Sequence, residues 1–344
     1  MRNLFPEFNT PSPKGFNRLW TEAVFVFDTN VLLSLYRLPE KARKDLLSIF
    51  FKLKTKIWIP HYVAMEYYRK RIEVIYDQER AYKNILQIFE ENEKGVLNQL
   101  RGFKHPFIDG EAISKTFSSN CCDIRKEIEK KRKKHPDWHK KDIVENKLNK
   151  IFKNKIGSAY DQKRLDEIYS LGKNRYDKDI PPGYKDKDND NSDKTNTRKF
   201  GDLIIWFQIM DKAKELKKPI IFVTDEQKED WWWKISDHTL GPRYELKKEI
   251  KEYASVGFHM YKTDKFMKFA GEFLRITYSK GSIEDVKKLT DEAQKKQGAK
   301  SLDASVTVSV SDVVGVSEAI KIEDSNIGGS ESNVGSENPN IESK

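Results

Sequence analysis

The sequence predicts an α/β fold in which helices cover both faces of a central parallel sheet. Short apolar runs alternate with segments of helical period near both ends of the folded part, within residues 1–76 and 200–278. The predicted strands are apolar at nearly every position, which is typical of parallel strands buried on both faces. A chain of 344 residues is long enough to bury such a sheet.

The first segment reads as strand, helix, strand, helix. The run AVFVF (23–27) predicts a buried strand, and PEKARKDLLSIFFKL (39–53) predicts an amphipathic helix with a proline near its start. KIWIP (56–60) predicts a second strand, and HYVAMEYYRKRIEVIYDQ (61–78) opens the next helix. This alternation indicates parallel pairing.

The segment near the other end repeats this order. It reads as a helix at 201–218, a strand that ends in acid at 219–226, a helix at 244–254, a strand at 257–261 and a helix at 263–278. The two segments together therefore supply the sheet and the helices that cover it.

The intervening residues 77–180 are expected to be helical and strongly basic. Residues 125–155 alone hold 13 basic and 5 acidic side chains. This pattern is equally typical of a solvated helical face and of a basic wall beside a cleft. Trp138, Tyr160 and Tyr169 are available for base stacking in the second case, although packing is the commoner role of such aromatics.

Four regions are expected along the chain. Residues 1–280 form the main domain, with 77–180 as a basic helical insertion. Residues 281–299 form a charged helix, and the Ser-, Val-, Asn- and Glu-rich residues 300–344 form a disordered acidic tail.

The net charge of +10 is unevenly distributed. Eight acidic and two basic residues lie from Ser301 onward, so the first 300 residues hold 62 basic against 46 acidic side chains. Such an excess attracts polyanions and makes nucleic acid the first partner class to consider. Lysine-rich surfaces also serve solubility alone.

The two cysteines, Cys121 and Cys122, are adjacent in the sequence and cannot complete a four-ligand zinc site. We expect a reducing, cytoplasmic environment. The N-terminal stretch has no apolar core of signal-peptide length, and no apolar run approaches the roughly 20 residues that span a bilayer. We therefore expect no membrane association.

Four acidic residues are expected at the edge where the carboxyl ends of the strands meet. These are Asp28, Glu66, Asp202 and Asp225. Clustered carboxylates repel one another unless protons or cations neutralise them, and all-oxygen ligands suit Mg²⁺ or Mn²⁺. Such ions activate water and support in-line displacement at phosphorus, which is phosphodiester hydrolysis.

Each acid also has an ordinary structural explanation. These explanations are a turn or helix cap at Asp28 and Asn30, an N-cap at Asp202, a capping box that starts at Thr224 and contains Asp225, and an ion pair between Glu66 and Lys70. Separately they suffice, but they do not explain why all four acids fall on one edge. A calcium-binding loop at Asp186 is not supported, because Asn191 and Thr197 stand where such a loop needs Gly and Glu.

With these residues in place, the chain resembles PIN-like domain nucleases, in particular a large bacterial group of uncharacterised function. The matching stretches are VFDTNVLLSLYR (26–37), IWIPHYVAMEYYRKR (57–71), RKFGDLIIWFQI (198–209), PIIFVTDEQKEDWWW (219–233) and LGPRYEL (240–246). The resemblance implies a Rossmann-like three-layer α/β/α sandwich. It also implies metal-dependent cleavage of nucleic acid, most often RNA, that leaves a 5′ phosphate and a 3′ hydroxyl.

The resemblance also implies roles for individual residues. The catalytic acids that bind Mg²⁺ or Mn²⁺ would be Asp28, Glu66, Asp202 and Asp225, with Asn30 steadying Asp28, Thr224 as an accessory residue, and Asp230 and Glu229 as further candidate acids. The nucleic-acid contacts would be Lys70, Arg71 and Lys228. The three tryptophans would form either a stacking floor or part of the core; they are Trp231, Trp232 and Trp233.

The function expected first is therefore that of a metal-dependent endoribonuclease, with DNA as the other substrate and phage defence or toxicity as the role. The alternative is a catalytically inactive nucleic-acid-binding or regulatory module. A haloacid-dehalogenase-type phosphatase is disfavoured, because it needs an acid where Asn30 stands. Toxin-type PIN proteins lack the long insertion, which could dock a protein partner such as an ATPase or a second copy of the chain.

Overall fold

The computed structural model describes residues 4–9, 11–187, 197–236, 238–279 and 281–292. Residues 1–290 form one compact unit, which is the unit described below. Part of the predicted charged helix, the whole predicted acidic tail (300–344) and loop residues 188–196 lie outside the described residues.

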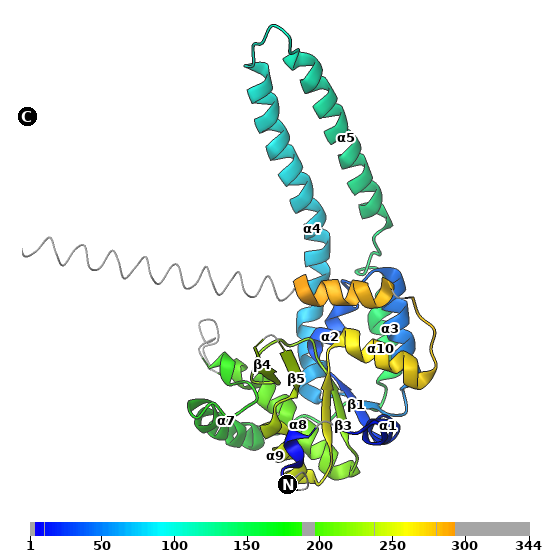
Figure 1. Cartoon of the computed structure of the whole chain (residues 1–344), viewed down its shortest axis with the longest axis vertical. Helices are drawn as coiled ribbons and strands as arrows, with labels where there is room; N and C mark the ends of the chain where they lie inside the picture. Colours follow the sequence, from blue (N-terminus) through cyan, green and yellow to red (C-terminus); the bar gives the residue numbers. More distant parts are fainter. Residues whose placement is uncertain (1–3, 10, 188–196, 237, 280, 293–344) are drawn as a thin grey trace, which may run out of the picture. The chain divides into compact units, whose positions relative to one another are not determined.

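A four-stranded parallel sheet forms the centre of this unit (Figure 1), in the order β2-β1-β3-β6. Its strands are β1 (Val24–Phe27), β2 (Ile57–Trp58), β3 (Ile220–Val223) and β6 (Phe258–Tyr261). All four strands were predicted from their apolar runs, and the parallel pairing is confirmed. Because β1 and β3 are neighbours in register from Val24↔Ile220 to Phe27↔Val223, their carboxyl ends lie side by side.

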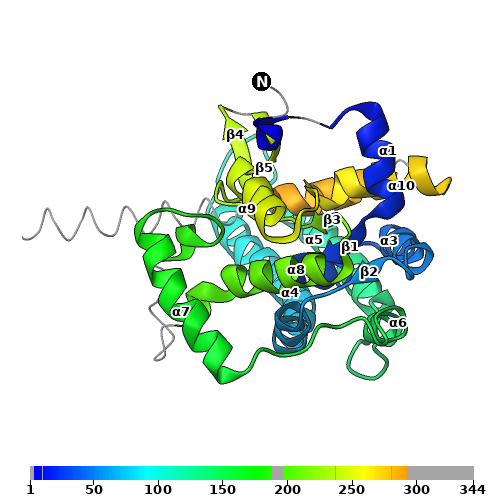
Figure 2. The same ribbon diagram turned by 90° about the horizontal axis from the view of Figure 1, so that it is seen from below.

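Helices pack on both faces of the sheet. The helices up to residue 274 are α1 (Pro13–Glu22), α2 (Thr29–Ser34), α3 (Glu40–Lys52), α4 (His61–Arg101), α5 (Gly110–Lys134), α6 (Ile143–Ile151), α7 (Gln162–Asp177), α8 (Gly201–Leu216), α9 (Tyr244–Ala254) and α10 (Thr263–Leu274), with 3₁₀ turns η1 (Pro6–Phe8), η2 (Tyr184–Asp186) and η3 (Arg198–Phe200). Figure 2 shows α8 crossing beneath the strands when the unit is viewed from below.

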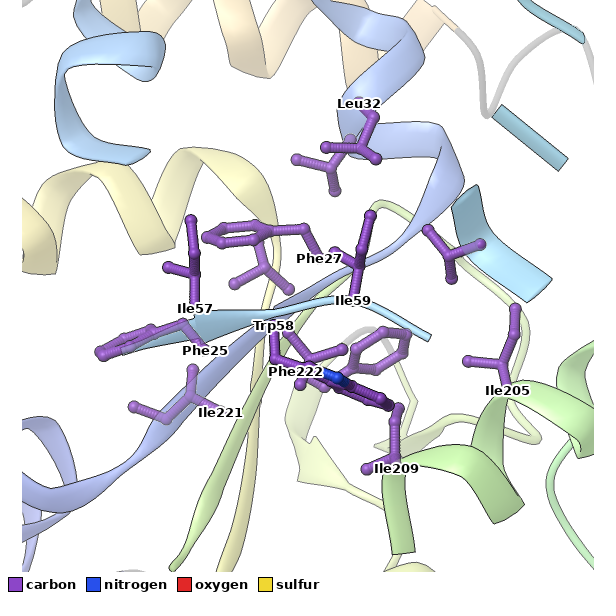
Figure 3. Close-up of a cluster of buried hydrophobic side chains, with 14 of the residues drawn as sticks. Phe25, Phe27, Leu32, Ile57, Trp58, Ile59, Ile205, Ile209, Ile221 and Phe222 are labelled. Carbon is purple, nitrogen blue, oxygen red and sulfur yellow. The ribbon is translucent and has the colours of Figure 1, made fainter. Parts of the chain in front are cut away.

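The alternation of side chains along the strands divides the core between two faces. Phe27 of β1 contacts Phe50 of α3 and Phe266 of α10, with ring centroids 4.2 and 5.3 Å apart. Trp206 of α8 packs against Phe258 of β6 at 5.0 Å. Figure 3 shows apolar side chains of the strands and of α8 meeting in this core. This core fixes the strand ends on which the site depends.

The helical insertion differs from its predicted boundaries. There is no break at residue 77, because α4 runs unbroken for 41 residues, or about 60 Å. Its distal part lies alongside α5 (Figure 1), and the buried Glu93 of α4 accepts hydrogen bonds from Arg125 and Ser118 of α5. The rest of the predicted insertion is not helical throughout: α6 and α7 are separated by loops and pack onto the core.

Two further segments complete the described residues, and only the first of them was not predicted. The tryptophan-rich stretch forms an antiparallel pair, β4 (Trp232–Ile235) with β5 (His238–Pro242). Residues 281–290 are helical as predicted, and the hydroxyl of Ser282 donates to Asp45 of α3 at 2.7 Å. Within the described ranges, no helix has both the length and the apolar character that crossing a membrane requires.

Candidate active site

Asp28 lies at the carboxyl end of β1 and caps α2. Its Oδ1 accepts a hydrogen bond from the backbone N–H of Thr29 at 2.7 Å. Its Oδ2 accepts from Nδ2 of Asn30 at 2.8 Å and from the hydroxyl of Thr224 at 2.6 Å. Both oxygens of this partly buried carboxylate are therefore held in fixed directions.

The parallel pairing of β1 and β3 explains why Thr224 reaches Asp28. Phe27 and Val223 are partners in the register, so the residues that follow them emerge together. Asn30 ties the two strand ends further, since its Oδ1 accepts from the backbone N–H of Asp225 at 3.0 Å. The amide side chain thus serves both strand ends without adding negative charge.

Glu66 approaches the same place from α4. Its Oε2 accepts from the hydroxyl of Thr29 at 2.6 Å, and its Oε1 forms an ion pair with Lys70 at 2.7 Å. The side chain of Glu66 is 18% exposed, so its charge acts on Asp28 through a partly dehydrated medium.

Asp202 lies in the first turn of α8, where the backbone at Gly183 packs closely against it. Its Oδ2 accepts from Nε1 of the buried Trp231 at 3.0 Å. Gly183 has a φ of +90°, and a Cβ atom there would lie 3.1 Å from the Cβ of Asp202 and would collide with the hydroxyl of Tyr176. Only glycine fits at residue 183 for both reasons.

Asp225 is directed away from Asp28. One of its carboxylate oxygens accepts from the backbone N–H of Thr263 at 2.9 Å, and the other accepts from the Thr263 hydroxyl at 2.8 Å. Asp225 therefore serves the first turn of α10. The charged residues that act on Asp28 and Asp202 are Glu66, Glu226, Asp186 and Lys228, and Asp225 is not one of them.

Glu226 and Asp186 join the site although the sequence analysis assigned neither to it. The charge of Glu226 acts on both Asp28 and Asp202, and that of Asp186 acts on Asp202. With the end of β3 known, Glu226 could have been predicted from the sequence. In an extended segment the side chains of Thr224 and Glu226 point to the same side, and the side chain of Asp225 points to the opposite side. Asp186 had none, because it belongs to a separate loop.

Lys228 forms an ion pair inside this group of acids. Its Nζ lies 2.6 Å from Asp186 Oδ1 and 3.8 Å from Glu226 Oε2. Although burial lowers the pKa of Lys228, the charges of Asp202, Glu226 and Asp186 outweigh it, and the pKa lies above its ordinary value. Lys228 is therefore a charged partner of the acids.

The buried Asp230 fixes the loop that carries Asp186. Its Oδ2 accepts from the backbone N–H groups of Gly183 and Lys185, at 3.0 and 3.2 Å. The predicted further acid Glu229 instead pairs at the surface with Lys185 at 2.5 Å.

The other predicted contacts have internal partners. Arg71 pairs with Asp142 at 2.8 Å and with Glu145, which joins α4 to α6. Trp231 and Trp232 are buried, and Nε1 of Trp232 donates to the backbone carbonyl of Glu226 at 2.7 Å. Two of the three tryptophans therefore orient the acidic residues.

Two acids of the site, Asp28 and Asp202, have pKa values well above the ordinary value of an aspartate. Burial raises the pKa of Asp28 to about 7, against the hydrogen bond from Thr224, and the charge of Glu66 raises it further. Burial also raises the pKa of Asp202 well above its ordinary value, which Lys228 partly offsets. A bound cation would stabilise the charged form of both carboxylates and so lower their pKa values.

The donor set suits a hard divalent cation, because every candidate ligand is a carboxylate oxygen. Among the described residues, no three Asp, Glu, His or Cys side chains are grouped closely enough to hold a metal ion. Mg²⁺ generally keeps several water ligands and binds through one or two carboxylates, so the arrangement remains compatible with it.

Comparison with known protein families identifies a match over most of the compact unit. The family described as "PIN like domain" matches residues 24–246, which is more than half of the chain and spans Asp28, Glu66, Asp202 and Glu226. No curated protein and no solved structure matches the chain.

Proposed function

The chain belongs to the PIN-like domain family, and from this premise we propose that it is a nuclease that hydrolyses phosphodiester bonds in RNA with Mg²⁺ or Mn²⁺. The observation that carries the proposal is the geometry at the ends of β1 and β3, where hydrogen bonds from Thr29, Asn30 and Thr224 fix the Asp28 carboxylate and the Thr29 hydroxyl holds Glu66 beside it. The excess of basic residues outside the C-terminal tail supports a polyanionic substrate.

In this proposal one or two carboxylates from among Asp28, Glu226 and Asp202 would hold the ion, with water as its other ligands. The bound ion would supply an activated water and offset charge on the phosphate. The hydrogen bonds from Asn30 and Thr224 keep the Asp28 carboxylate in one orientation. Trp231 does the same for Asp202. Fixed carboxylates need no rearrangement of their own during the reaction.

The remaining polar groups would act on the substrate. Lys228 places a positive charge beside Asp202 and Glu226, where a phosphate would approach. The Thr29 hydroxyl donates to Glu66 Oε2 and so orients this carboxylate. The other oxygen, Oε1, pairs with the more exposed Lys70. Glu66 would thereby accept a proton from water or return one to the leaving oxygen.

A second candidate is a module that binds nucleic acid without cleaving it. The observation in its favour is Lys228, whose ammonium already neutralises part of the acidic group. This reading needs no divalent cation.

Cleavage assays separate the two candidates. Purified protein would be incubated with single-stranded RNA, structured RNA and single-stranded DNA, in Mn²⁺ or in EDTA. We expect RNA cleavage only with Mn²⁺, loss of cleavage in Asp28→Asn, and normal cleavage in Asp77→Asn, which removes an exposed carboxylate from the same helix as Glu66. Binding of RNA without cleavage under any of these conditions would replace the nuclease with the binding module.

A further inference from the structure

A cleft with walls of aromatic and basic side chains opens beside the acidic site. Its volume is about 400 Å³, within the range of sites that hold small molecules. The walls come from the start of α4, from α7 and the segment before it, and from η3 with α8. Its chemistry is set by His61, Tyr62, Arg69, Tyr160, Tyr169 and Arg198.

The charge of the cleft is opposite to that of the acidic site. None of the described residues that line it is acidic, whereas two arginines and a histidine are present. The three tyrosines supply aromatic faces. Aromatic faces next to guanidinium groups are the combination by which proteins hold unpaired nucleotides, since bases stack on the rings and phosphates contact the cations.

Tyr62 connects the cleft to the acids. It precedes Glu66 by one turn of α4, and the charge of Glu66 contributes to its raised pKa, whose main cause is burial. The ring also lies against Gly201, because a Cβ atom there would come within 3.0 Å of Tyr62 Cε1. Asp202 is the next residue, so Tyr62 stands between the cleft and two acids of the site.

Hydrogen bonds behind the walls hold the cleft in shape. The backbone N–H of Tyr62 donates to Gln208 Oε1 at 3.1 Å, and Gln208 Nε2 donates to the carbonyl of Ser158 at 3.3 Å. The hydroxyl of Tyr160 donates to Asp211 at 2.5 Å. These contacts join α4, α8 and the segment before α7, so a ligand would meet a preformed site.

We propose that this cleft holds an unpaired nucleotide of single-stranded RNA next to the phosphate that is cleaved. The base stacks on Tyr62, and the backbone phosphate contacts Arg69 and Arg198. The proposal rests on the nuclease function above and adds to it a substrate class, because a base paired in a duplex cannot enter a cleft beside the acids.

Binding measurements test the base contact. The probes are a fluorescein-labelled single-stranded RNA of about twelve nucleotides and the same backbone without bases, each titrated in EDTA and followed by fluorescence anisotropy. Wild type should bind the base-bearing probe more tightly. Tyr62→Leu should bind that probe roughly tenfold more weakly and the abasic probe as wild type does, whereas Tyr62→Phe keeps the ring and the preference.

The phosphate contact has its own readout. Arg69→Ala should weaken both probes equally and reduce the slope of log K against log salt by about 0.7, the value for one phosphate contact on a single strand. Arg18→Ala, an exposed arginine of α1 paired with Glu22, is the matched control and should leave both affinities unchanged. Thermal melting of each variant establishes that it is folded.

The outcomes distinguish the cleft from the catalytic proposal. Suppose that the wild-type protein cleaves single-stranded RNA in Mn²⁺ and that Tyr62→Leu binds both probes as the wild type does. This outcome would refute the proposed nucleotide site in the cleft and would support the nuclease function. Base-dependent binding that Tyr62→Leu abolishes, without cleavage, would support the cleft and overturn the nuclease. Equal wild-type affinity for a duplex of the same length would contradict the requirement for an unpaired base.

Discussion

The two halves of the acidic site are held in place by different means. Asp28 is oriented by Thr29, Asn30 and Thr224, which closely follow the ends of the neighbouring strands β1 and β3. The Asp202 half instead depends on Lys228 and on the segment that carries Asp186, whose backbone donates hydrogen bonds to Asp230. The first half is thus a consequence of the sheet, whereas the second is assembled from segments distant in the sequence.

The largest effect is expected at the half that the sheet builds. Asp28→Asn keeps the shape of the side chain but removes its charge, so cation binding at the strand ends is lost. Because changes to the partners of metal ligands commonly cost about 10- to 100-fold, we expect loss of a ligand to lower Mn²⁺-dependent cleavage by more than about 100-fold. A wild-type rate in this variant, measured in single-turnover assays, would refute the role of Asp28.

Glu226 and Asp225 are adjacent in sequence and offer a matched pair. Glu226→Gln should reduce cleavage by about 10- to 100-fold, because the charge of Glu226 acts on both Asp28 and Asp202. Asp225→Asn should cleave close to the wild-type rate and affect mainly the packing of α10. The reverse pattern would return Asp225 to the site and displace Glu226 from it.

Lys228 tests how the other half is neutralised. Lys228→Met leaves Asp186, Glu226 and Asp202 without their cation, so the metal-free protein should lose about 1–3 kcal/mol of unfolding free energy. Mn²⁺ should restore stability more in this variant than in wild type. Chemical denaturation with and without Mn²⁺ measures both. Lys44→Met, which removes an exposed lysine of α3 paired with Glu40, is the control.

The smallest expected effect is a pH dependence of the metal-free protein. Burial raises the pKa of Asp28 from 3.8 to about 7, so the folded state binds its proton more tightly than the unfolded state. This contribution is complete below about pH 4 and is lost as the pH rises through 7. In Asp28→Asn the melting temperature should therefore fall less over this range, by a few degrees; an unchanged pH profile would contradict the shift.

The same contrast explains what could be predicted from sequence. The four strands and the Asp28 motif depend on local patterns, namely apolar runs and a turn at a strand end, and they were found. Which of the residues after β3 turns toward Asp28 depends on the exact residue at which the strand ends. The sequence does not reveal that residue, so Asp225 was selected and Glu226 was not. Asp186 reaches the site only through the hydrogen bonds of Asp230 to Gly183 and Lys185, which no local pattern indicates.

The fold was less predictable where long-range packing decides it. The boundary at residue 77, which was predicted from the basic composition of residues 77–180, is wrong because α4 continues past it to Arg101. Buried residues such as Trp138, Phe152 and Tyr176 pack α6, α7 and their flanking segments onto the core. The tryptophans at 231 and 232 carry no periodicity that reveals their hydrogen bonds to Asp202 and to the carbonyl of Glu226. The partner of Trp231 lies 29 residues away in the sequence, beyond the reach of a local pattern.

The central claim is that the two halves together form a divalent-cation site. Its most direct test is an anomalous difference map from crystals of the protein grown with Mn²⁺. We expect an Mn²⁺ ion in contact with carboxylates of Asp28, Glu226 or Asp202, together with water ligands. An ion held at Asp225 and Thr263, or no ion at the end of the sheet at millimolar Mn²⁺, would contradict the account.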